Sequence, residues 1–511
     1  MIFTKLFDQS VERTPERPAI VDLTDGSETT YEELRRRAYA FASELDRRDV
    51  GPGDRVAICM ANRPEHVVAF LGTQLAGVVA VPFNFRLAAG GVRYHLRDAD
   101  PELFLFDDVS RDAVLAAEAD VDVESAYVGE NVPEFAEPFE SLLDGPADHP
   151  GVSVDHADPS VMLYSSGTTG DPKGIPLDQE ATASRFLVNS LGQGYYLDET
   201  MIGVMPLYHT VGLHGILCGL LAMSGTYLCM VEFDPETAVR AIEEHGVTAL
   251  HEAPTIFSQM LATDAIEETD VSSVETVGYS GAPMSQEVFD RTLETFDPDH
   301  IANLYGTTES YGTLAYPDLR EVRDPAVTGP ANVGNETRIV EIGSDDPEAV
   351  VDVGQQGELV VNTDSPVTFG GYWNKPEATE AAITDGWFFT GDVARRTEAN
   401  QTIITGRVGD MIISGGENVQ PTEVEDVLAS HPAIADVGVV GLPDEEWGEV
   451  VTAFVVSSED LSAEALDEWC RQSDELADFK RPRAYRFVDE LPRNPSGKIR
   501  RNELEGGTAE E

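Results

Sequence analysis

Short apolar runs alternate with helix-like stretches along the chain to about residue 325. The runs RVAIC (55–59), TYLCMV (226–231) and TVGYS (276–280) contain the β-branched and aromatic residues that strands favour. Residues 32–47 and 235–245 instead repeat their apolar positions at the spacing of a helix. This alternation predicts parallel strands covered by helices. Two further runs fit the same pattern: GVVAVPF (77–83) and GVTAL (246–250).

The pattern changes near residue 326. Short, glycine-punctuated strands follow (TRIVEIG, GELVVNT, GWFFTGDVARR and QTIITGR), and they predict a small antiparallel or barrel-like unit. After Gly406, helix and strand patterns alternate again, which predicts an α+β unit of ordinary domain size. We therefore expect an α/β fold. Its large N-terminal domain would cover 1–409, with two α/β subdomains to about 325 and a β-barrel-like subdomain over about 326–409, and a small α+β domain would cover 410–511.

Two uncharged stretches, 66–85 and 211–231, approach the length of a membrane span. Both contain glycine, and the second holds His214 and Thr226 and ends in a strand-like run. A buried helix followed by a strand is therefore favoured over a membrane span. The first residues contain no apolar signal core, so secretion is not expected.

The cysteines show neither the CxxC spacing of a zinc site nor the density of a disulfide framework. They lie in apolar or helix-like segments, so we expect reduced core thiols in a cytoplasmic protein. The four are Cys59, Cys218, Cys229 and Cys470.

Acidic residues outnumber basic ones by 93 to 34, which gives a formal net charge of −59. A field of that sign repels phosphate backbones and anionic lipid surfaces, so binding to nucleic acid or to a membrane surface is disfavoured. Disorder is disfavoured as well, because 41% of the residues are hydrophobic. Only 5 of the basic residues are lysine, and an acidic, lysine-poor chain resembles proteins of halophiles that work at high internal salt. An acidic-partner or cation-storage role is the alternative explanation of the charge.

The segment LYSSGTTGDPKG, residues 163–174, has the composition of a phosphate-binding loop. A strand-like run leads into Ser, Thr and Gly residues that expose backbone N–H groups and hydroxyls, and Lys173 stands at the end. The segment is not a Walker A loop, because Gly174 follows Lys173 and the glycine spacing differs. A plain Gly/Ser turn is the alternative, but a lysine retained in a lysine-poor chain argues against it.

Two further segments carry residue types suited to a nucleotide and its metal ion. In MPLYHTVGLHG (205–215), His209 follows an apolar run, where a buried structural histidine is the alternative. In NLYGTTES (303–310), Tyr305 could stack on a flat ring and Glu309 could bind a cation beside phosphates.

Four more segments extend this set. Asp392 in GWFFTGD and Arg407 in TGRVGDMIISGGENVQPTEVE could hydrogen-bond ribose hydroxyls. YSGAPMS (279–285) precedes NLYGTTES in the chain, and LPRNPSGKIRR (491–501) holds Lys498 in a Gly-containing loop.

In their order along the chain and at these separations, these segments resemble the AMP-forming acyl-CoA synthetases of the adenylate-forming superfamily. The similarity spans residues 163–501 and is strongest to the benzoate and 4-chlorobenzoate:CoA ligase type. MPLYHTVGL, NLYGTTES, GRVGDMIISGGEN and above all ELADFKRPRAYRFVDELPRNPSGKIRR carry it. The resemblance implies an acid–thiol ligase that uses ATP, Mg²⁺, coenzyme A and a small-molecule carboxylic acid. A homodimer is left open.

The resemblance also implies two half-reactions. A carboxylate attacks the α-phosphate of ATP to give an acyl-adenylate and pyrophosphate, and the CoA thiol then attacks the carbonyl and releases AMP. Lys498 would bridge the carboxylate and the α-phosphate, Thr308 would contact the α-phosphate, and Glu309 would hold Mg²⁺. His209 completes the expected catalytic set.

The remaining nucleotide contacts are implied by the same motifs. The β- and γ-phosphates would meet Ser165, Ser166, Gly167, Thr168, Thr169, Gly170 and Lys173. Adenine would be enclosed by Gly281, Ala282, Pro283 and Tyr305, with Gly306 and Thr307 in the same binding set. Asp392 and Arg407 would fix the ribose.

In this family the small C-terminal domain is mobile and rotates between the two half-reactions. Asp410 matches the hinge, and rotation would bring Gly415, Gly416 and Glu417 near the pantetheine tunnel. Many relatives carry a lysine before the hinge aspartate, whereas this chain has Gly409. Because glycine widens backbone freedom, we expect easier domain switching.

Residues 479–501 contain eight basic side chains against two acidic ones. Such a concentration in an acidic chain favours a ligand with several phosphates. The resemblance assigns it to CoA, with Trp447 and Phe479 flanking the adenine and Arg481, Arg483 and Arg86 meeting phosphates. A solvated basic face that balances acidic neighbours is the alternative.

The acyl pocket is inferred by position from the same relatives. Its walls would be Arg185 to Leu187, His209 to Val211, His251, Ser280, Gly281, Leu304, and Tyr311 with Gly312. His251 stands where chlorobenzoate-type ligases have an apolar aromatic residue, and Tyr311 replaces a smaller neighbour. Because a buried polar group demands a partner, these residues favour a hydroxylated aromatic acid. A medium- or long-chain fatty acid is the alternative, as is packing of His251 away from the pocket.

Two other functions are weighed against a CoA ligase. An adenylating enzyme could load the phosphopantetheine of a carrier protein, or oxidise the adenylate as luciferases do, but the basic cluster favours free CoA. A non-catalytic nucleotide-binding or scaffold protein is disfavoured because the chain retains Lys173, Glu309, Asp392, Arg407 and Lys498.

Overall fold

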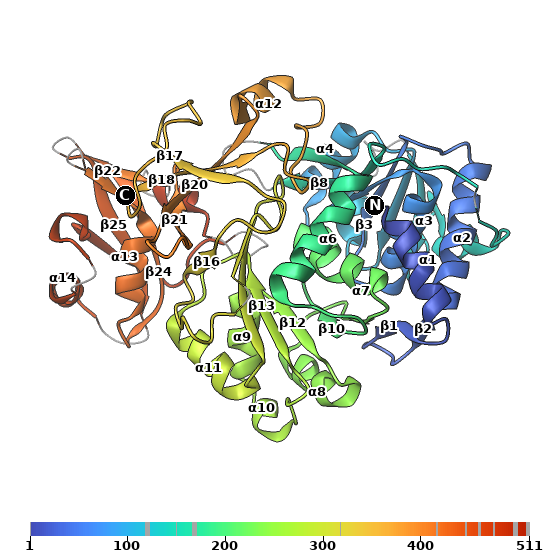
Figure 1. Ribbon diagram of the computed structural model, residues 1–511, viewed down its shortest axis with the longest axis horizontal. Coiled ribbons are helices and arrows are strands. Elements are labelled where there is room, and N and C mark those ends of the chain that lie inside the picture. The colour runs from blue at the N-terminus through green and yellow to red at the C-terminus, as the bar shows by residue number, and fades with distance from the viewer. Residues whose placement is uncertain are drawn as a thin grey trace. The chain divides into compact units, whose positions relative to one another are not determined.

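The computed structural model describes residues 2–117, 123–149, 151–165, 171–316, 318–414, 417–444, 447–457, 461–473, 476–493 and 499–506 (Figure 1). The chain forms two compact units. Unit 1 comprises Met1–Thr337 and Val361–Phe388, and unit 2 comprises Arg338–Val360 and Phe389–Glu511. Unit 2 therefore contains much of the β-rich segment together with the C-terminal region. The expected domain boundary at 409/410 is the point about which the C-terminal domain would rotate, and it stays a prediction.

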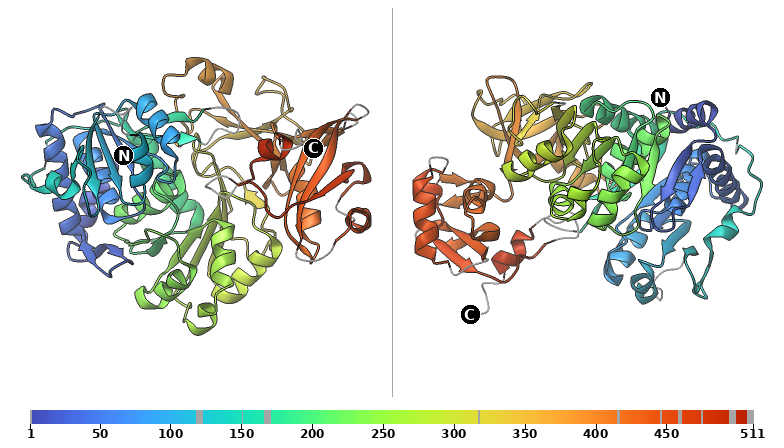
Figure 2. Two further views of the ribbon diagram at one scale, coloured as in Figure 1. Left: turned by 180° about the vertical axis from the view of Figure 1, so that it is seen from behind. Right: turned by 90° about the horizontal axis from the view of Figure 1, so that it is seen from below.

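The first sheet of unit 1 has the strand order β7-β6-β5-β3-β4-β8-β9. All neighbouring strands run parallel except the β8–β9 hairpin. The strands are β3 (Arg55–Cys59), β4 (Val79–Pro82), β5 (Leu103–Asp107), β6 (Glu124–Val128), β7 (Ala136–Pro138), β8 (Pro159–Ser165) and β9 (Lys173–Asp178). Figure 2 (right) shows its blue strands beside helices of the same colour.

The second sheet of unit 1 has the order β15-β14-β13-β12-β10-β11-β1-β2. It is parallel except at its two edges, β1–β2 and β14–β15. The strands are β1 (Pro18–Asp22), β2 (Glu28–Thr30), β10 (Thr200–Gly203), β11 (Thr226–Cys229), β12 (Ala249–Glu252), β13 (Thr276–Ser280), β14 (His300–Tyr305) and β15 (Leu314–Tyr316). The predicted parallel α/β class is thus confirmed.

Helices cover both sheets, and local sequence sets their ends. Helix α6 begins where the Asp178 carboxylate accepts the Ala181 N–H, and it ends at Gly194 in the left-handed conformation. The helical segments of unit 1 are α1 (Phe3–Arg13), α2 (Tyr31–Arg47), α3 (Pro64–Ala76), α4 (Ala89–Ala99), α5 (Arg111–Ala117), η2 (Phe139–Leu143), α6 (Gln179–Gln193), η3 (Val211–Cys218), α7 (Gly219–Ala222), α8 (Pro235–His245), α9 (Pro254–Leu261), α10 (Ala265–Glu268), α11 (Gln286–Phe296) and α12 (Pro376–Ala382). Two short strands, β16 (Val327–Gly329) and β19 (Ile383–Thr384), also lie in this unit.

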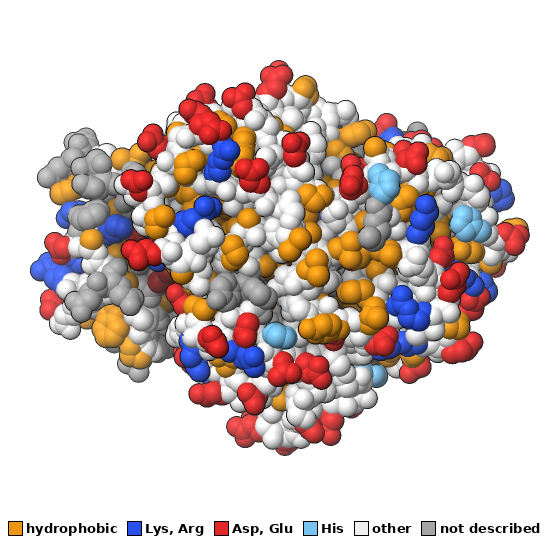
Figure 3. Space-filling model, in the orientation of Figure 1, with side chains coloured by type: hydrophobic (Ala, Val, Ile, Leu, Met, Phe, Trp, Pro, Cys, Tyr) orange, Lys and Arg blue, Asp and Glu red, His pale blue; other side chains and the backbone are white. Residues whose placement is uncertain are grey.

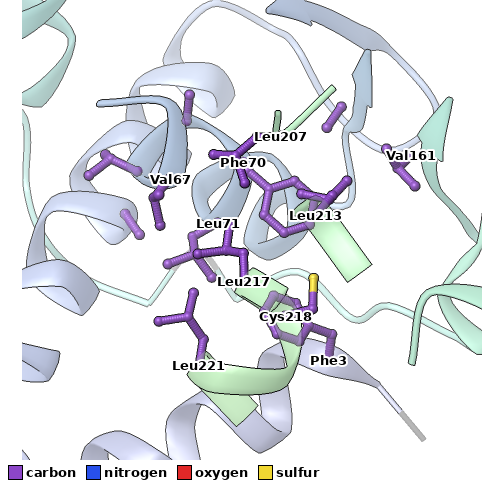
Figure 4. Packing of buried hydrophobic residues seen from close by; sticks show 14 of the residues in the cluster. Phe3, Val67, Phe70, Leu71, Val161, Leu207, Leu213, Leu217, Cys218 and Leu221 are labelled. Carbon is purple, nitrogen blue, oxygen red and sulfur yellow. The ribbon is translucent and has the colours of Figure 1, made fainter. Parts of the chain in front are cut away.

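The two uncharged stretches pack against each other in the main core (Figure 4). Leu213, Leu217 and Leu221 of η3 and α7 lie beside Phe70 and Leu71 of α3, and all five are buried. Each stretch is a helix followed by a strand, as the sequence predicted. Among the described residues, no helix is long and apolar enough to cross a membrane.

Unit 2 combines the β-rich segment with the C-terminal α+β segment. The first forms a sheet in the order β21-β20-β18-β17, from β17 (Thr337–Val340), β18 (Gln356–Asn362), β20 (Trp387–Arg396) and β21 (Thr402–Arg407). The second sheet, β23-β22-β25-β24 with β26 beside β25, contains β22 (Ile412–Ser414), β23 (Glu417–Val419), β24 (Ile434–Asp444), β25 (Gly448–Ser457) and β26 (Ala484–Phe487). Its helical segments are α13 (Pro421–Ala429), α14 (Ala463–Gln472), η4 (Asp478–Lys480) and α15 (Arg501–Gly506).

All four cysteines are buried free thiols, which agrees with their prediction as core residues. Figure 3 shows acidic side chains spread over the visible face, with apolar side chains between them. The dense negative charge of the sequence is therefore displayed at the surface.

Candidate active site

The predicted phosphate loop joins the two strands of the β8–β9 hairpin. Ser165 and Lys173 face each other as the last register pair of that hairpin. The hairpin thus brings the two ends of the loop together and fixes Lys173 at its exit. The predicted residues between them, Ser166, Gly167, Thr168, Thr169 and Gly170, lie outside the described residues.

Lys173 and Glu309 meet through Tyr372, a residue the sequence analysis did not identify. The Lys173 ammonium lies 4.6 Å from the centre of the Tyr372 ring, and the Tyr372 hydroxyl donates a 3.0 Å hydrogen bond to Oε1 of Glu309. Burial raises the pKa of the Tyr372 phenol, and the Glu309 carboxylate raises it further, so the phenol remains a donor. A cation and a carboxylate are therefore held beside each other without forming a direct pair.

The segment 306–310 makes a tight turn after β14. The Thr307 N–H donates to the Ser310 carbonyl, and the Thr307 hydroxyl accepts the Ser310 N–H at 3.1 Å. Gly306 is required by close approach, since a Cβ there would lie 2.6 Å from the Gly312 nitrogen. Thr308 and Glu309 in this turn remain partly exposed and can meet a ligand.

The loop after β13 is open to solvent. Gly281, Ala282 and Pro283 are exposed, and Gly281 has φ +85° with no atom within 4 Å of where a Cβ would lie. The Ser285 hydroxyl caps α11 and ends the loop. Because β13 and β14 are parallel neighbours, Tyr305 ends the strand beside this loop. The residues predicted to enclose adenine thus follow adjacent strand ends.

Three residues predicted for the acyl pocket form one apolar cluster. Leu304 and Tyr311 pack with Ala315, and Val211 lies against them. Val211 begins η3, a π-helix, a form that often occurs at functional sites. His209 lies just before it, with its ring 4.4 Å from that of Tyr208.

His251 is fully buried and points into the same region. Its Nε2 lies 3.1 Å from the hydroxyl of Ser280, and its Nδ1 lies 3.1 Å from Nε2 of Gln193. Burial lowers the pKa of His251 to about 3, so the ring is neutral at physiological pH. This contact joins two residues predicted for the acyl pocket, while Gln193 is a further member that the sequence analysis did not identify.

Arg185 is a fully buried cation on α6. Its guanidinium donates to the backbone carbonyls of Val367 at 2.9 Å and Glu309 at 3.1 Å, and it lies 3.4 Å from the Thr210 hydroxyl. Burial lowers the pKa of Arg185 to about 9, with the Glu309 carboxylate acting in the opposite sense. Arg185 therefore supports the backbone of the turn that carries Glu309.

Asn189 and Gln193 could have been found from their spacing. They follow Arg185 at positions i+4 and i+8 of α6, which places all three on one helix face. The sequence analysis named only 185–187 from this segment. No comparable local signal marks Tyr372, because its contact to Glu309 joins positions 63 residues apart.

In unit 2, Asp392 and Arg407 form a cross-strand pair on β20 and β21. Arg407 Nε lies 2.9 Å from Asp392 Oδ1, and Asp392 is almost fully buried. The predicted hinge residue Asp410 lies 3.8 Å from Arg501 Nε, and Nη2 of Arg501 contacts Glu425 at 2.9 Å. Gly415, Gly416 and Lys498 lie outside the described residues, as do the side chains of Glu417 and Phe479.

The basic cluster divides into two groups. Arg481 pairs with Asp467 and lies 3.3 Å from Asp478, so its charge is already compensated. Arg483 instead stacks over Trp447, with its guanidinium carbon 3.7 Å from the ring centre. Acidic partners also meet the other paired members: Lys480, Arg493, Arg500 and Arg501.

Arg86, assigned to the same ligand, lies in unit 1. It is exposed, and its guanidinium carbon lies 5.2 Å from the Phe85 ring centre. Phe85 contacts Tyr208 edge to face at 5.6 Å, and Tyr208 contacts His209. A series of ring contacts through Phe85 and Tyr208 thus connects Arg86 to His209.

Two family models match the chain. A model described as AMP-binding enzyme matches residues 7–373, and one described as AMP-binding enzyme C-terminal domain matches residues 423–498. Together they include the β8–β9 hairpin, the 306–310 turn and residues 479–498 of the basic cluster.

Curated relatives match over nearly the whole chain. A 4-chlorobenzoate–CoA ligase of Arthrobacter is 37% identical, covering 97% of this chain and 93% of the relative. A feruloyl-CoA synthase of Amycolatopsis is 32% identical, covering 94% of each chain. The long-chain-fatty-acid–CoA ligase FadD13 of Mycobacterium tuberculosis is 31% identical, covering 95% and 94%.

Solved structures show the same fold. ATP-bound MatB from Rhodopseudomonas palustris superimposes with a TM-score of 0.88 at 28% identity, covering 100% of this chain and 99% of that one. The predicted arrangement of a large α/β region followed by a small C-terminal region is therefore that of known nucleotide-binding structures.

Proposed function

This chain belongs to the AMP-binding enzyme family and is an AMP-forming acyl-CoA ligase that uses ATP, Mg²⁺ and CoA, and from that premise we propose that its acid is aromatic, of the benzoate type. The higher identity to the 4-chlorobenzoate ligase than to the fatty-acid ligase supports this choice. The bulky residues Tyr311 and His251 at the acyl site support it too. A medium- or long-chain fatty acid is the alternative.

The Lys173, Tyr372 and Glu309 arrangement is the observation that carries the site assignment. Two anions, a carboxylate and a polyphosphate, must approach each other, so charge neutralisation and positioning dominate the chemistry. Lys173 and the loop beginning at Ser165 would hold the β- and γ-phosphates. Thr308, partly exposed in its turn, would contact the α-phosphate.

Glu309 fits a magnesium ligand. Its carboxylate is partly exposed, and Tyr372 holds one oxygen, which fixes the group's orientation. Hard carboxylate oxygen is the donor that Mg²⁺ prefers. When bound there, Mg²⁺ supplies charge neutralisation on the polyphosphate. Arg185 holds the Glu309 backbone in place from the protein interior.

The other nucleotide contacts are proposed from their motifs. Gly281, Ala282, Pro283 and Tyr305 would enclose the adenine, since they follow neighbouring strands. Asp392 would accept hydrogen bonds from the ribose hydroxyls, and Arg407, which lies 2.9 Å from Asp392, would keep that carboxylate oriented.

Lys498 is proposed as the catalytic lysine of adenylation, bridging the substrate carboxylate and the α-phosphate. His209, next to the π-helix, is proposed to line the passage between the acyl site and the thiol. Rotation about Asp410 would then replace Lys498 with the segment containing Gly415, Gly416 and Glu417.

The contacts of Arg483 and Trp447 support these two residues as the CoA-binding pair. The stacked pair offers a cation and an aromatic face together, which suits a phosphorylated adenine nucleotide. Phe479 and Arg86 are proposed to contribute further stacking and charge. Arg481 is the weaker member because two carboxylates already hold it.

The proposal also includes a hydroxyl group on the ring of the aromatic acid. In the neutral ring of His251, one nitrogen can donate to Ser280 Oγ, which leaves the Ser280 O–H to donate to a substrate hydroxyl. Activity in the cytoplasm of a halophile fits the buried free thiols and the net charge of −59.

The test is carboxylate-dependent pyrophosphate release, measured with and without CoA over a panel of aromatic and aliphatic acids at high and low salt. The proposal predicts highest kcat/KM for benzoate-type acids, CoA-stimulated turnover, and loss of activity in dilute buffer. Pyrophosphate release without CoA stimulation would favour loading of a carrier protein. Preference for long-chain acids would overturn the aromatic assignment, and full activity without salt would overturn the halophile assignment.

A further inference from the structure

Helix α6 presents a polar stripe to the interior of unit 1. Arg185, Asn189 and Gln193 follow each other at intervals of four residues, and each is fully buried. Polar groups on a buried helix face are costly unless they are paired. Their partners therefore show what this face holds in place.

Asn189 is the centre of the network. Its Oδ1 accepts hydrogen bonds from the Tyr311 hydroxyl at 3.0 Å and from Gln193 Nε2 at 3.2 Å, and its Nδ2 donates to the Gly215 carbonyl at 2.9 Å. One amide thus ties the Tyr311 ring to the backbone of the π-helix η3. Tyr311 cannot rotate away without leaving a buried acceptor unpaired.

Gln193 holds His251 in the same way. Its Nε2 lies 3.1 Å from His251 Nδ1, and its Oε1 accepts the Tyr195 hydroxyl at 3.0 Å. Gln193 Nε2 also lies 3.2 Å from His251 Nε2, and that ring nitrogen faces the Ser280 hydroxyl at 3.1 Å. The neutral ring offers one donor and one acceptor nitrogen to these two partners. Both ring nitrogens are then paired within the protein.

The side chains also close the space physically. A Cβ on Gly215 would lie 2.2 Å from the Tyr311 hydroxyl oxygen and 3.5 Å from Cε1 of His251. A Cβ on Gly278 would lie 1.6 Å from Oε1 of Gln193. The backbones of η3 and β13 therefore contact this network directly. A longer acyl chain could enter an interior packed so closely only by displacing these side chains, at a cost in strain.

We infer that Asn189 and Gln193 are specificity-determining positioning residues, which lock Tyr311 and His251 as the closed far end of the acyl site and limit the length of the acyl group. This inference rests on the proposed function of the site. Along α6, Arg185 supports the Glu309 turn and Gln193 lies eight residues further on, a rise of about 12 Å. An extended long-chain acyl group exceeds that span, whereas a benzoate ring fits within it.

The experiment uses the full-length protein and two ladders of acids of increasing length. One ladder is benzoate, 4-ethylbenzoate and 4-pentylbenzoate, and the other is butyrate, octanoate and dodecanoate. The measured quantity is the ratio of kcat/KM for the shortest and longest member of each ladder. The wild-type protein is expected to prefer the short member at least tenfold in whichever ladder it accepts.

Variants distinguish an effect on acyl-length selectivity from a general loss of stability. Gln193→Ala and Asn189→Ala are expected to reduce the short-to-long ratio at least tenfold, because His251 or Tyr311 loses its anchor and volume is opened. Gln193→Met, which keeps the volume but not the hydrogen bonds, is expected to reduce the ratio as well. Gln179→Ala is the matched control, since Gln179 is a fully buried glutamine of the same helix that bonds to Gln74 instead. It is expected to lower stability and leave the ratio unchanged.

The outcomes are distinguishable from those of the proposed function. A wild-type protein that prefers aliphatic acids but stops at short chains would overturn the aromatic assignment and support the closed end. A wild-type preference for 4-pentylbenzoate or dodecanoate would overturn the closed end. So would a folded Gln193→Ala variant with the wild-type ratio. An unchanged ratio in Gln193→Met alone would overturn hydrogen bonding as the lock.

Discussion

The Tyr372 hydroxyl donates a 3.0 Å hydrogen bond to Oε1 of Glu309. The same tyrosine ring lies 4.6 Å from the ammonium of Lys173, so one side chain positions both the proposed magnesium ligand and the phosphate-loop lysine. Tyr372 itself carries no charge, and its pKa is raised by burial and by Glu309. It acts by orienting its two neighbours.

Replacing Tyr372 with Phe keeps the ring beneath Lys173 and removes the hydrogen bond. A hydrogen bond to a charged group contributes about 1.5–3 kcal/mol, so adenylation should fall by about ten- to a hundredfold. The loss should be partly recovered by raising Mg²⁺, because the free carboxylate can still bind it. Pyrophosphate release as a function of Mg²⁺ concentration measures this. A Tyr372→Phe variant with the wild-type magnesium dependence would show that the bond does not orient Glu309.

Lys498→Ala should separate the two half-reactions. Removing a positioned cation from a developing charge typically costs about 10²–10³ in rate, and this loss should fall on adenylation alone. Thioester formation from supplied acyl-adenylate and CoA should remain close to wild type. Lys375→Ala is the control, because Lys375 is held by Asp98 and Tyr94 away from the proposed roles. Equal loss of both half-reactions in Lys498→Ala would refute its assignment.

Arg483→Ala should raise the KM for CoA about tenfold, because it removes a cation stacked on Trp447. Arg481→Ala should change it much less, since Asp467 and Asp478 already compensate that charge. The KM for ATP should be unaffected in both. Steady-state kinetics with varied CoA check this. Equal effects of the two variants would show that pairing with carboxylates does not reduce the contribution of Arg481 to CoA binding.

Asp410→Pro should leave adenylation intact and slow thioester formation, because proline fixes φ at the proposed hinge. Asp410→Asn is the matched control. It removes the charge that faces Arg501 at 3.8 Å but keeps ordinary backbone freedom, so both half-reactions should persist. Rapid-quench measurement of each half-reaction distinguishes the two variants. Unchanged thioester formation in Asp410→Pro would contradict hinge motion at this residue.

Glu252→Gln should stabilise the protein in a pH-dependent way. Glu252 is buried, burial raises its pKa, and neither carboxylate oxygen has a hydrogen bond of normal geometry from the described residues, although the Val204 amide lies near enough to favour ionisation. Its folded pKa lies above its unfolded value, so the stability it contributes is present below about pH 4.5 and is lost as the pH rises toward the folded pKa, by about 1.4 kcal/mol per unit.

The gain from Glu252→Gln should therefore be small near pH 4.5 and large near pH 8. Urea unfolding at both values, in the same high salt, measures it. Glu243→Gln, an exposed acid on α8, is the control and should show little change at either pH. A gain from Glu252→Gln that is equal at both pH values would contradict a raised folded pKa of Glu252.

Much of the fold followed from local pattern. RVAIC is β3 and TVGYS is β13 at the predicted residues, and α8 spans the predicted 235–245. The run GVTAL was placed too early, because Gly246 has φ +61° and caps α8, so the strand begins at Ala249. Apolar periodicity does not distinguish the end of a helix from the start of the next strand; the backbone conformation of one glycine does.

By itself, the sequence determined the family through the order of its motifs, the alternation that makes a parallel sheet, and the residue types that can neutralise phosphates. Tertiary structure alone decided which of these residues pair. Tyr311 bonds to Asn189 across 122 positions, and His251 bonds to Gln193 across 58. Arg481 is compensated by acids, whereas Arg483 stacks on Trp447. The physical reason is that periodicity reports which way a side chain faces, while its partner depends on how distant elements pack.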